Sequence, residues 1–458
     1  MEKLATYETK RYWHVVFPAF GQSVASMLPL LVDIYFMARF TAADGVAAIA
    51  SMLPFFFLSA VVSSAYTRAG SVIALQQGSS QGLSTNVGAI NLMVLANGIL
   101  FGFAVSAVVL IWLLAFPHIV SWTVGQSRLF TIYGYSVLLA LALGPVRSAI
   151  ATVFTTRVRP DLILRCNVLY CISNVLLNLI ACATLVRTSN DAAAVVGAST
   201  SVAAVVTTFY GLWLVRKHKN LFPIDFSLRN LASVEPWKQF LQVAVPSALE
   251  PASFGLASLV NATVFGAISA PSLAARAFVR NLTVVADHFS FAHGYWIEVM
   301  AAASYGAGNL SKDRLAMVRR TLFAGIICLM LFAFSAASSW FLYATTVAED
   351  VREAIILVLL FEVPAQILTI LNISLVNFLI STGSPAFPAK SAVFVTWFVT
   401  VPMLIIFVFV LNYGFIIALC ISLFDSILRT AINSGYFFYV KRPALSGRRH
   451  FKLEGEIH

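Results

Sequence analysis

Apolar segments long enough to cross a lipid bilayer follow one another along almost the whole chain, from Trp13 to Val440. About 20 residues of helix, rising about 1.5 Å each, span the hydrocarbon core. Of the 458 residues, 60% are hydrophobic and 11% are charged, a composition that soluble globular domains do not have. No polar segment between the apolar runs could bury a core of its own. We therefore expect one all-α polytopic membrane domain.

The apolar runs divide into twelve predicted spans, and the basic residues between them set the orientation. With both termini on one side, that side collects twenty-one Lys and Arg residues, and the opposite loops and helix ends hold five. The positive-inside rule makes the basic side cytoplasmic. We expect a multi-pass protein of the cell's inner (cytoplasmic) membrane with both termini in the cytoplasm. The predicted spans are 13–38, 46–75, 86–115, 129–153, 162–187, 193–215, 238–266, 272–303, 315–341, 353–380, 386–410 and 414–440.

The formal net charge of +11 is accounted for by this asymmetry. A basic protein could bind nucleic acid, but here the excess lies in the loops on one side of the membrane. We expect no nucleic-acid partner. The expected surroundings are the lipid bilayer, with the protein acting as a monomer.

The two halves of the chain resemble each other at a shift of 228 residues. This shift pairs Pro18 with Pro246 and Asp33 with Asn261, and it also pairs glycines in the segments LQQGSSQG and SYGAGNLS. Six spans in each half give both halves the same orientation, so a pseudo-two-fold axis along the membrane normal should relate them. The predicted parts are an N-terminal lobe (1–215), a cytoplasmic linker (216–237), a C-terminal lobe (238–440) and a basic tail (441–458).

The first span, Trp13 to Ala38, contains two unusual residues, Pro18 and Asp33. Proline removes a backbone donor and lets a helix bend, so Pro18 is a candidate hinge. A carboxylate within a membrane span normally faces a protein interior or a watery cavity and marks an ion or substrate path. Together they suggest a proton or cation switch; the alternative is a structural kink in which neighbouring helices satisfy Asp33.

Motifs for nucleotide or metal chemistry are absent from the sequence. The segment GAGNLSK (306–312) has Ser311 where a P-loop needs glycine before its lysine, so we interpret it as a tight turn between two helices. The pair Asp287 and His288 with His293 could form an enzyme site, but no HExxH accompanies them. We expect no enzymatic activity, no bound metal and no cofactor other than a coupling ion.

These features together resemble the multidrug and toxic compound extrusion (MATE) family of the multidrug, oligosaccharidyl-lipid and polysaccharide (MOP) exporter superfamily. The resemblance covers nearly the whole chain and rests on Pro18 and Asp33, the turns QQGSSQG and YGAGN, the segment Asn174 to Asn178, and the six-plus-six plan. It implies a secondary antiporter that exports organic compounds in exchange for H+ or Na+. The alternative is a lipid-linked oligosaccharide flippase of the same superfamily.

The resemblance also implies a set of ion-coupling residues. The family's first-helix acid corresponds to Asp33 and its fifth-helix asparagine to Asn174. Many prokaryotic members have an aspartate four residues later, where this chain has Asn178, so a site with two acids is in doubt here. In the second half, Glu250 and Glu362 are candidates because other members use acids on these two helices.

Further polar residues of the eighth and twelfth spans are candidates for a cavity or for simple charge pairing. Charges inside a membrane pair with one another by preference, so a self-neutralising network is the simpler alternative. A flippase would need many cations for a pyrophosphate, and the few interior cations here are balanced by acids, which favours the antiporter. Because Asp33, Glu250 and Glu362 are available and few interior cations are unpaired, we expect small organic substrates that are cationic or zwitterionic amphiphiles. The residues are Arg280, Asp287, His293 and Glu298 on the eighth span, and the i,i+4 pair Asp425 and Arg429 on the twelfth.

The predicted orientation can be tested in the central linker. A Lys219→Cys variant should stay unlabelled by a membrane-impermeant thiol reagent in intact cells and react after the cells are permeabilised, because Lys219 is expected in the cytoplasm. Ready labelling from outside would contradict the topology.

Overall fold

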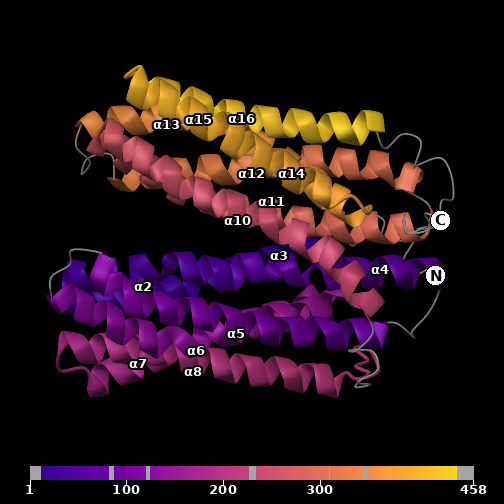
Figure 1. The fold of residues 1–458 in the computed structure, drawn as a ribbon, viewed down its shortest axis with the longest axis horizontal. Coiled ribbons are helices and arrows are strands. Elements are labelled where there is room, and N and C mark those ends of the chain that lie inside the picture. Colours follow the sequence, from indigo (N-terminus) through magenta and orange to yellow (C-terminus); the bar gives the residue numbers. More distant parts are fainter. Residues whose placement is uncertain are drawn as a thin grey trace. The chain divides into compact units, whose positions relative to one another are not determined.

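The computed structural model describes residues 12–81, 87–119, 124–225, 234–308, 310–343 and 349–440, and the basic tail predicted at 441–458 lies outside these residues. Every regular element among the described residues is a helix (Figure 1). The elements are α2 (Tyr12–Phe57), η2 (Leu58–Val62), α3 (Ser63–Thr67), α4 (Ala69–Gln81), α5 (Val87–Ile119), α6 (Val124–Thr155), α7 (Pro160–Leu185), α8 (Ser189–Lys217), α10 (Val234–Ile268), α11 (Ala270–Gly306), α12 (Leu310–Tyr343), α13 (Glu349–Ser381), α14 (Ala386–Phe394), η3 (Val395–Thr400), α15 (Val401–Leu404), η4 (Ile405–Val410), α16 (Phe415–Gly435) and η5 (Tyr436–Val440).

Ten of the described helical stretches are long and apolar enough to cross a membrane. The first two, Tyr12–Thr41 and Met52–Gln76, correspond to the first two predicted spans, and α2 includes the connection between them. Helices α10 and α11 are not among the ten. Helix α11 contains Arg276, Arg280, Asp287 and Glu298, which make it polar for a membrane helix.

Prolines and π-helical turns interrupt several of the long helices. Helix α2 contains Pro18, Pro29 and Pro54, and the second span passes through the π-helical turn η2 just after the last of these. The span at 386–410 alternates between α and π geometry, with Pro402 in its middle. Proline lacks the N–H that a regular helix needs, and π turns are a common way to absorb such a disruption.

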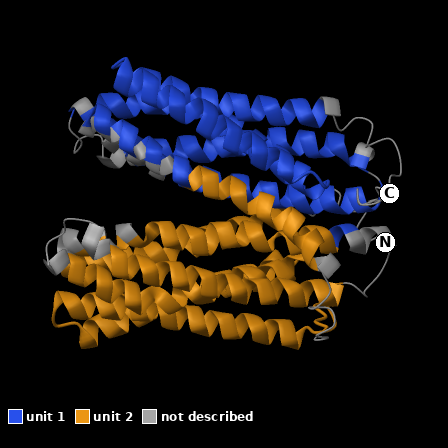
Figure 2. Cartoon of the chain, in the orientation of Figure 1, with its two compact units in different colours: residues 1–12, 75–82, 256–458 blue, residues 13–74, 83–255 orange. Residues whose placement is uncertain are grey.

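The chain packs as two compact units (Figure 2). Unit 2 comprises residues 13–74 and 83–255, and unit 1 comprises residues 1–12, 75–82 and 256–458. The division therefore falls within α4 and within α10, whereas the predicted lobes follow the sequence repeat and meet at the linker 216–237. Helices α2, α4 and α10 each have residues in both units.

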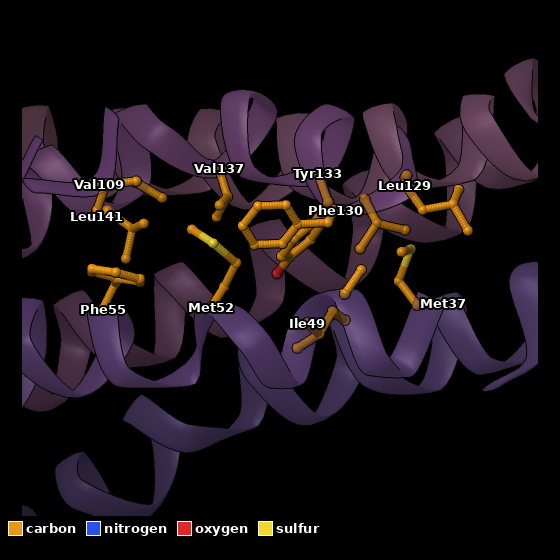
Figure 3. Close-up of a cluster of buried hydrophobic side chains, with 14 of the residues drawn as sticks. Met37, Ile49, Met52, Phe55, Val109, Leu129, Phe130, Tyr133, Val137 and Leu141 are labelled. Atoms are coloured by element: carbon orange, nitrogen blue, oxygen red, sulfur yellow. The ribbon is translucent and has the colours of Figure 1, made fainter. Parts of the chain in front are cut away.

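One of the two apolar core clusters described in unit 2 lies between α2, α5, α6, α7 and α8. Met37, Ile49 and Met52 of α2 pack against Phe130 and Tyr133 of α6 (Figure 3). All five side chains are buried. Burial of an apolar side chain of this size contributes about 1.5–3 kcal/mol in water, but within a membrane close packing itself is the main stabilising term.

Local sequence signals fix several helix ends. Thr188 caps α8 through a capping box with Asp191, and the basic residues Arg216 and Lys217 occupy its last turn, where they interact favourably with the helix dipole. Between α11 and α12 the chain turns at Gly308, whose φ of 71° favours glycine. Of the segment GAGNLSK, Gly306 ends α11, Ala307 and Gly308 form a turn, and the residues from Leu310 on belong to α12.

Gly197 lets α8 approach α6 closely. A Cβ at this position would lie 2.7 Å from Ser136 Cβ and 3.0 Å from the backbone oxygen of Tyr133. Gly325 of α12 is a suitable comparison, because its Cβ would meet only Ile370 Cγ2, at 3.8 Å.

We expect Gly197→Ala to lower the thermal unfolding midpoint of the purified protein, with a cost of about 1–3 kcal/mol from overpacking. Gly325→Ala should leave the midpoint unchanged or raise it, since alanine favours a helix over glycine by about 1 kcal/mol. Equal midpoints for the two variants would show that the α6–α8 contact is not close packed.

Candidate functional site

Asp33 of α2 is fully buried and accepts hydrogen bonds from three other helices of unit 2. Thr200 Oγ1 of α8 donates to Asp33 Oδ2 at 2.6 Å, and the Tyr133 hydroxyl of α6 donates to the same oxygen at 3.2 Å. The amide nitrogens of Asn174 and Asn178, both on α7, lie 3.2 Å from Asp33 Oδ1. The structure therefore brings together the three residues that the sequence named in this half, Asp33, Asn174 and Asn178.

The helices present these groups through simple spacing. Asn174 and Asn178 are four residues apart and therefore lie on one face of α7, where the second donates to the first at 3.3 Å. Asn174 also donates to Thr200 Oγ1 at 2.8 Å, which joins α7 to α8. Tyr133 belongs to the apolar cluster of α6, so its ring packs among hydrophobic side chains while its hydroxyl reaches Asp33 (Figure 3).

This arrangement stabilises a carboxylate without cancelling its charge. Four donors point at the two oxygens of Asp33, and none of the described Lys, Arg or His residues lies within ion-pair distance of it. A buried charge that is hydrogen-bonded but unpaired still has a large cost, which a proton or a cation would remove.

One acceptor beside Asp33 is left over. Asn178 Oδ1 is buried and has no hydrogen-bond partner among the described residues. The amide nitrogen of the same side chain donates to Asp33 Oδ1, so Asn178 Oδ1 belongs to the cluster that also contains the carboxylate and Thr200 Oγ1. Oxygen ligands of this type suit hard cations. In the described part of the chain no group of three or more His, Cys, Asp or Glu residues gathers as a metal site.

The site also contains residues that the sequence interpretation passed over. Tyr133 and Thr200 were not predicted, although Thr200 stands in a run of three hydroxyl residues within an apolar span, which is a weak signal. The first span contains Pro29 in addition to Pro18. Pro29 lies four residues before Asp33, which places it one helical turn away, closer than the predicted hinge.

The acids predicted in the second half lie elsewhere. Glu362 of α13 pairs with Arg276 of α11 at 2.6 Å and accepts a hydrogen bond from Gln366 at 3.1 Å. Asp287 pairs with Arg280 at 2.9 Å along α11. All five of these residues belong to unit 1. The pairing expected between Arg280 and Asp287 is present.

The remaining candidates are separate from Asp33. Glu250 of α10 is half-buried in unit 2 and is not among the hydrogen-bond partners of Asp33. In unit 1, His293 is fully buried, with Nδ1 3.0 Å from the Tyr12 hydroxyl and Nε2 3.0 Å from Thr321 Oγ1. Glu298 is buried on the same helix.

A second ion pair on one helix was also expected. Asp425 and Arg429 of α16 form it, with Arg429 Nε 2.9 Å from Asp425 Oδ2. Thr400 donates to Asp425 at 2.6 Å, and Arg429 donates to Thr396 at 2.6 Å. This pair is thus enclosed by hydroxyl groups of η3.

Comparison with solved structures identifies the fold. An outward-facing multidrug resistance MATE family transporter of the MOP superfamily is 17% identical, with a TM-score of 0.80 and 96% of each chain covered. A MOP superfamily transporter from Pyrococcus furiosus, whose binding pocket of reversed polarity suggests a different function for it, is also 17% identical, with a TM-score of 0.79 over 95% of this chain and 96% of that chain. The eukaryotic MATE transporter AtDTX14 is 13% identical, with a TM-score of 0.79 over 94% and 96%.

No protein-family model matches the sequence, and no curated protein sequence matches it. At these identities the structural likeness shows the fold: the chain has the all-α architecture of MATE transporters, in which twelve membrane helices form two lobes. Together with the ten long apolar helices, this confirms the predicted all-α polytopic membrane fold.

The hydrogen bonds around Asp33 predict how replacing the Thr200 hydroxyl with a methyl group will change the stability of the protein. In a Thr200→Val variant Asp33 loses its shortest hydrogen bond, and hydrogen bonds to charged groups contribute about 1.5–3 kcal/mol. We expect a lower thermal unfolding midpoint. Thr207 is the matched control, because its hydroxyl on the same helix is buried with no hydrogen-bond partner among the described residues.

Thr207→Val should leave the midpoint unchanged or raise it slightly, since no hydrogen bond is lost. If the two valine variants unfold at the same temperature, Thr200 does not stabilise Asp33 in the way the geometry indicates.

Proposed function

We propose that this chain is a secondary active transporter of the MATE family, within the MOP superfamily, that exports an organic amphiphile in exchange for H+ or Na+ by alternating access. The observation that supports this most is the buried Asp33, which has four hydrogen-bond donors and no cationic partner among the described residues, in a chain with the fold of MATE transporters. The proposed surroundings are the inner membrane, with both termini cytoplasmic and the protein a monomer.

In this proposal, Asp33 binds the coupling ion. Its ionised carboxylate is held by Tyr133, Asn174, Asn178 and Thr200, and the uncancelled charge is removed when a proton or Na+ binds. With a proton, neutral Asp33 becomes a donor, and Asn178 Oδ1, which has no hydrogen-bond partner among the described residues, can accept from it once the amide group turns. With Na+, the same oxygen joins the carboxylate as a ligand. Because Asn178 replaces a possible second acid, the cluster has a single carboxylate and takes one positive charge.

Binding of the ion is coupled to movement through helix α2. Pro29 and Pro18 leave carbonyl groups of the preceding turns without their helical donors, so α2 has two positions where it can bend. A charged Asp33 holds α2 against α6, α7 and α8 through its hydrogen bonds. Neutralising it weakens those bonds and changes the relative stability of the bent and straight helix. Export requires that the substrate and the ion favour different states.

The flippase remains the alternative within the same superfamily. A pyrophosphate group has several negative charges and needs an excess of cations, yet the described arginines Arg276, Arg280 and Arg429 each pair with an acid. This pairing favours a substrate with a smaller charge. The acids Glu250 and Glu362, and the polar residues His293 and Glu298, are proposed as secondary contributors to coupling or to the cavity.

The decisive variant is Asp33→Asn, which keeps the shape and hydrogen-bonding capacity of the side chain and removes its charge. Ion-driven efflux from energised vesicles should be abolished while expression and folding are retained. Glu349→Gln is the matched control, because Glu349 is an exposed acid, paired with Arg352, at the first residue of α13. The control should transport at the wild-type rate.

The variants Glu250→Gln and Glu362→Gln distinguish coupling to H+ from coupling to Na+. If protons at Asp33 drive export, both variants should be milder than Asp33→Asn; if Na+ bound to acids of the second half drives it, they should be as severe. Wild-type efflux by Asp33→Asn under both a proton and a sodium gradient would refute the proposal.

A further inference from the structure

Unit 1 has a charged cluster that the coupling site does not use. Arg276 and Arg280 stand one turn apart on α11, so their side chains leave the same face of the helix. Arg276 Nη1 lies 2.6 Å from Glu362 Oε2, and Arg280 Nη1 lies 2.9 Å from Asp287 Oδ2. Two arginines and two acids make the cluster neutral as a whole.

In this cluster the arginine side chains are more exposed than the acidic side chains. The side chains of both acids are 9% exposed, whereas Arg276 is 29% exposed and Arg280 is 52% exposed. The ion pair of α16 shows the contrast, because its Arg429 is 10% exposed and its Asp425 is 17% exposed. An approaching molecule therefore meets guanidinium groups at the α11 cluster and cannot reach the acids directly.

Both guanidinium groups retain unused donors. Each ion pair and hydrogen bond of Arg276 and Arg280 among the described residues involves Nη1 alone. The edge formed by Nε and Nη2 is thus free on both residues. This edge is the planar fork that binds a carboxylate or phosphate through two parallel hydrogen bonds.

The position of Arg280 along α11, together with its exposure, indicates what surrounds its guanidinium group. It lies ten residues after the first residue of α11, Ala270, which corresponds to about 15 Å along the helix. A charged group at that depth normally faces protein or a water-filled cavity, because contact with lipid tails is costly. We therefore expect the half-exposed guanidinium of Arg280 to face water or polar groups and not lipid tails.

We propose that Arg276 and Arg280 form a binding site for the carboxylate or phosphate group of an amphiphile. This inference rests on the proposed transport function and names its substrate class: organic anions and zwitterions, with the charged group on α11. The sequence favoured cationic or zwitterionic substrates because Asp33, Glu250 and Glu362 were available and few interior cations were unpaired. In the structure Glu362 is paired with Arg276, and zwitterions are the class that both inferences share.

Three probes with one ring system test this proposal: 2-naphthoate, its methyl ester and 2-naphthylmethylamine, added to the purified full chain in a maltoside detergent that contains no phosphate. We expect 2-naphthoate to raise the thermal unfolding midpoint at concentrations at least tenfold below those at which the ester or the amine acts. Equal effects of all three probes would overturn the proposal.

Variants assign the effect to Arg280. In Arg280→Gln the apparent Kd for 2-naphthoate should rise at least tenfold, and in Arg280→Lys it should rise less, because lysine keeps the charge without the planar fork. Arg352→Gln is the control, because it removes a paired arginine in the first turn of α13 and should not change the binding of 2-naphthoate. Unchanged 2-naphthoate binding in Arg280→Gln would overturn the proposal.

Removing one member of an ion pair can destabilise the fold by leaving the other charge unpaired. The double variant Arg280→Gln with Asp287→Asn removes both charges, so it should fold and still lose 2-naphthoate binding. A folded double variant that binds 2-naphthoate like the wild type would contradict the assignment.

One further measurement distinguishes a lipid headgroup from a soluble amphiphile as the source of the anion. A second one distinguishes failure of the anion site from failure of the coupling role proposed for Asp33. Competition of phosphatidic acid with 2-naphthoate for the wild-type protein in mixed micelles would support a lipid headgroup as the natural occupant; absence of competition would support a soluble amphiphile. Asp33→Asn should bind 2-naphthoate normally. If that variant also transports normally, the coupling proposal fails while the anion site stands.

Discussion

A single carboxylate organises the N-terminal helices of this protein. Asp33 is buried where α2, α6, α7 and α8 meet, and each of the three partner helices contributes a hydrogen-bond donor to it. In a membrane interior an unpaired charge has a large cost, so the four donors are needed for the packing to persist around it. The same four donors do not neutralise the charge. The site is stable enough to form and still gains from binding a cation, which is the property a coupling site needs.

The charges of unit 1 follow a different rule. There, each described acid of the α11 and α13 cluster has an arginine within ion-pair distance, and the arginines are the accessible partners. Asp33 has hydrogen bonds without a counter-ion, and Glu362 and Asp287 have counter-ions. The two proposals rest on this difference: an ion is proposed to bind at Asp33 and the charged group of a substrate at Arg280. The two sets of residues belong to different packing units, so each can be substituted separately.

Helix α2 connects the chemistry of Asp33 to the architecture. It carries the acid, and it contains prolines one turn before the acid and near its own beginning. Its first residue, Tyr12, belongs to unit 1, where it packs with His293 and Trp296, and the rest of the helix belongs to unit 2. A change at Asp33 therefore acts on a helix that has bendable positions, which is the physical basis of the proposed coupling.

The sequence by itself determined the all-α membrane fold, because apolar length and the placement of Lys and Arg depend only on local composition. It also indicated Asp33, Asn174 and Asn178, since polar residues are conspicuous in apolar spans and a four-residue spacing places two of them on one face. It did not indicate Tyr133 or Thr200, because hydroxyl residues are common in such spans and only packing decides which of them meets Asp33. Nor did it determine that Glu362 is engaged by Arg276: the two are 86 residues apart, and only the contact between α11 and α13 brings opposite charges to 2.6 Å.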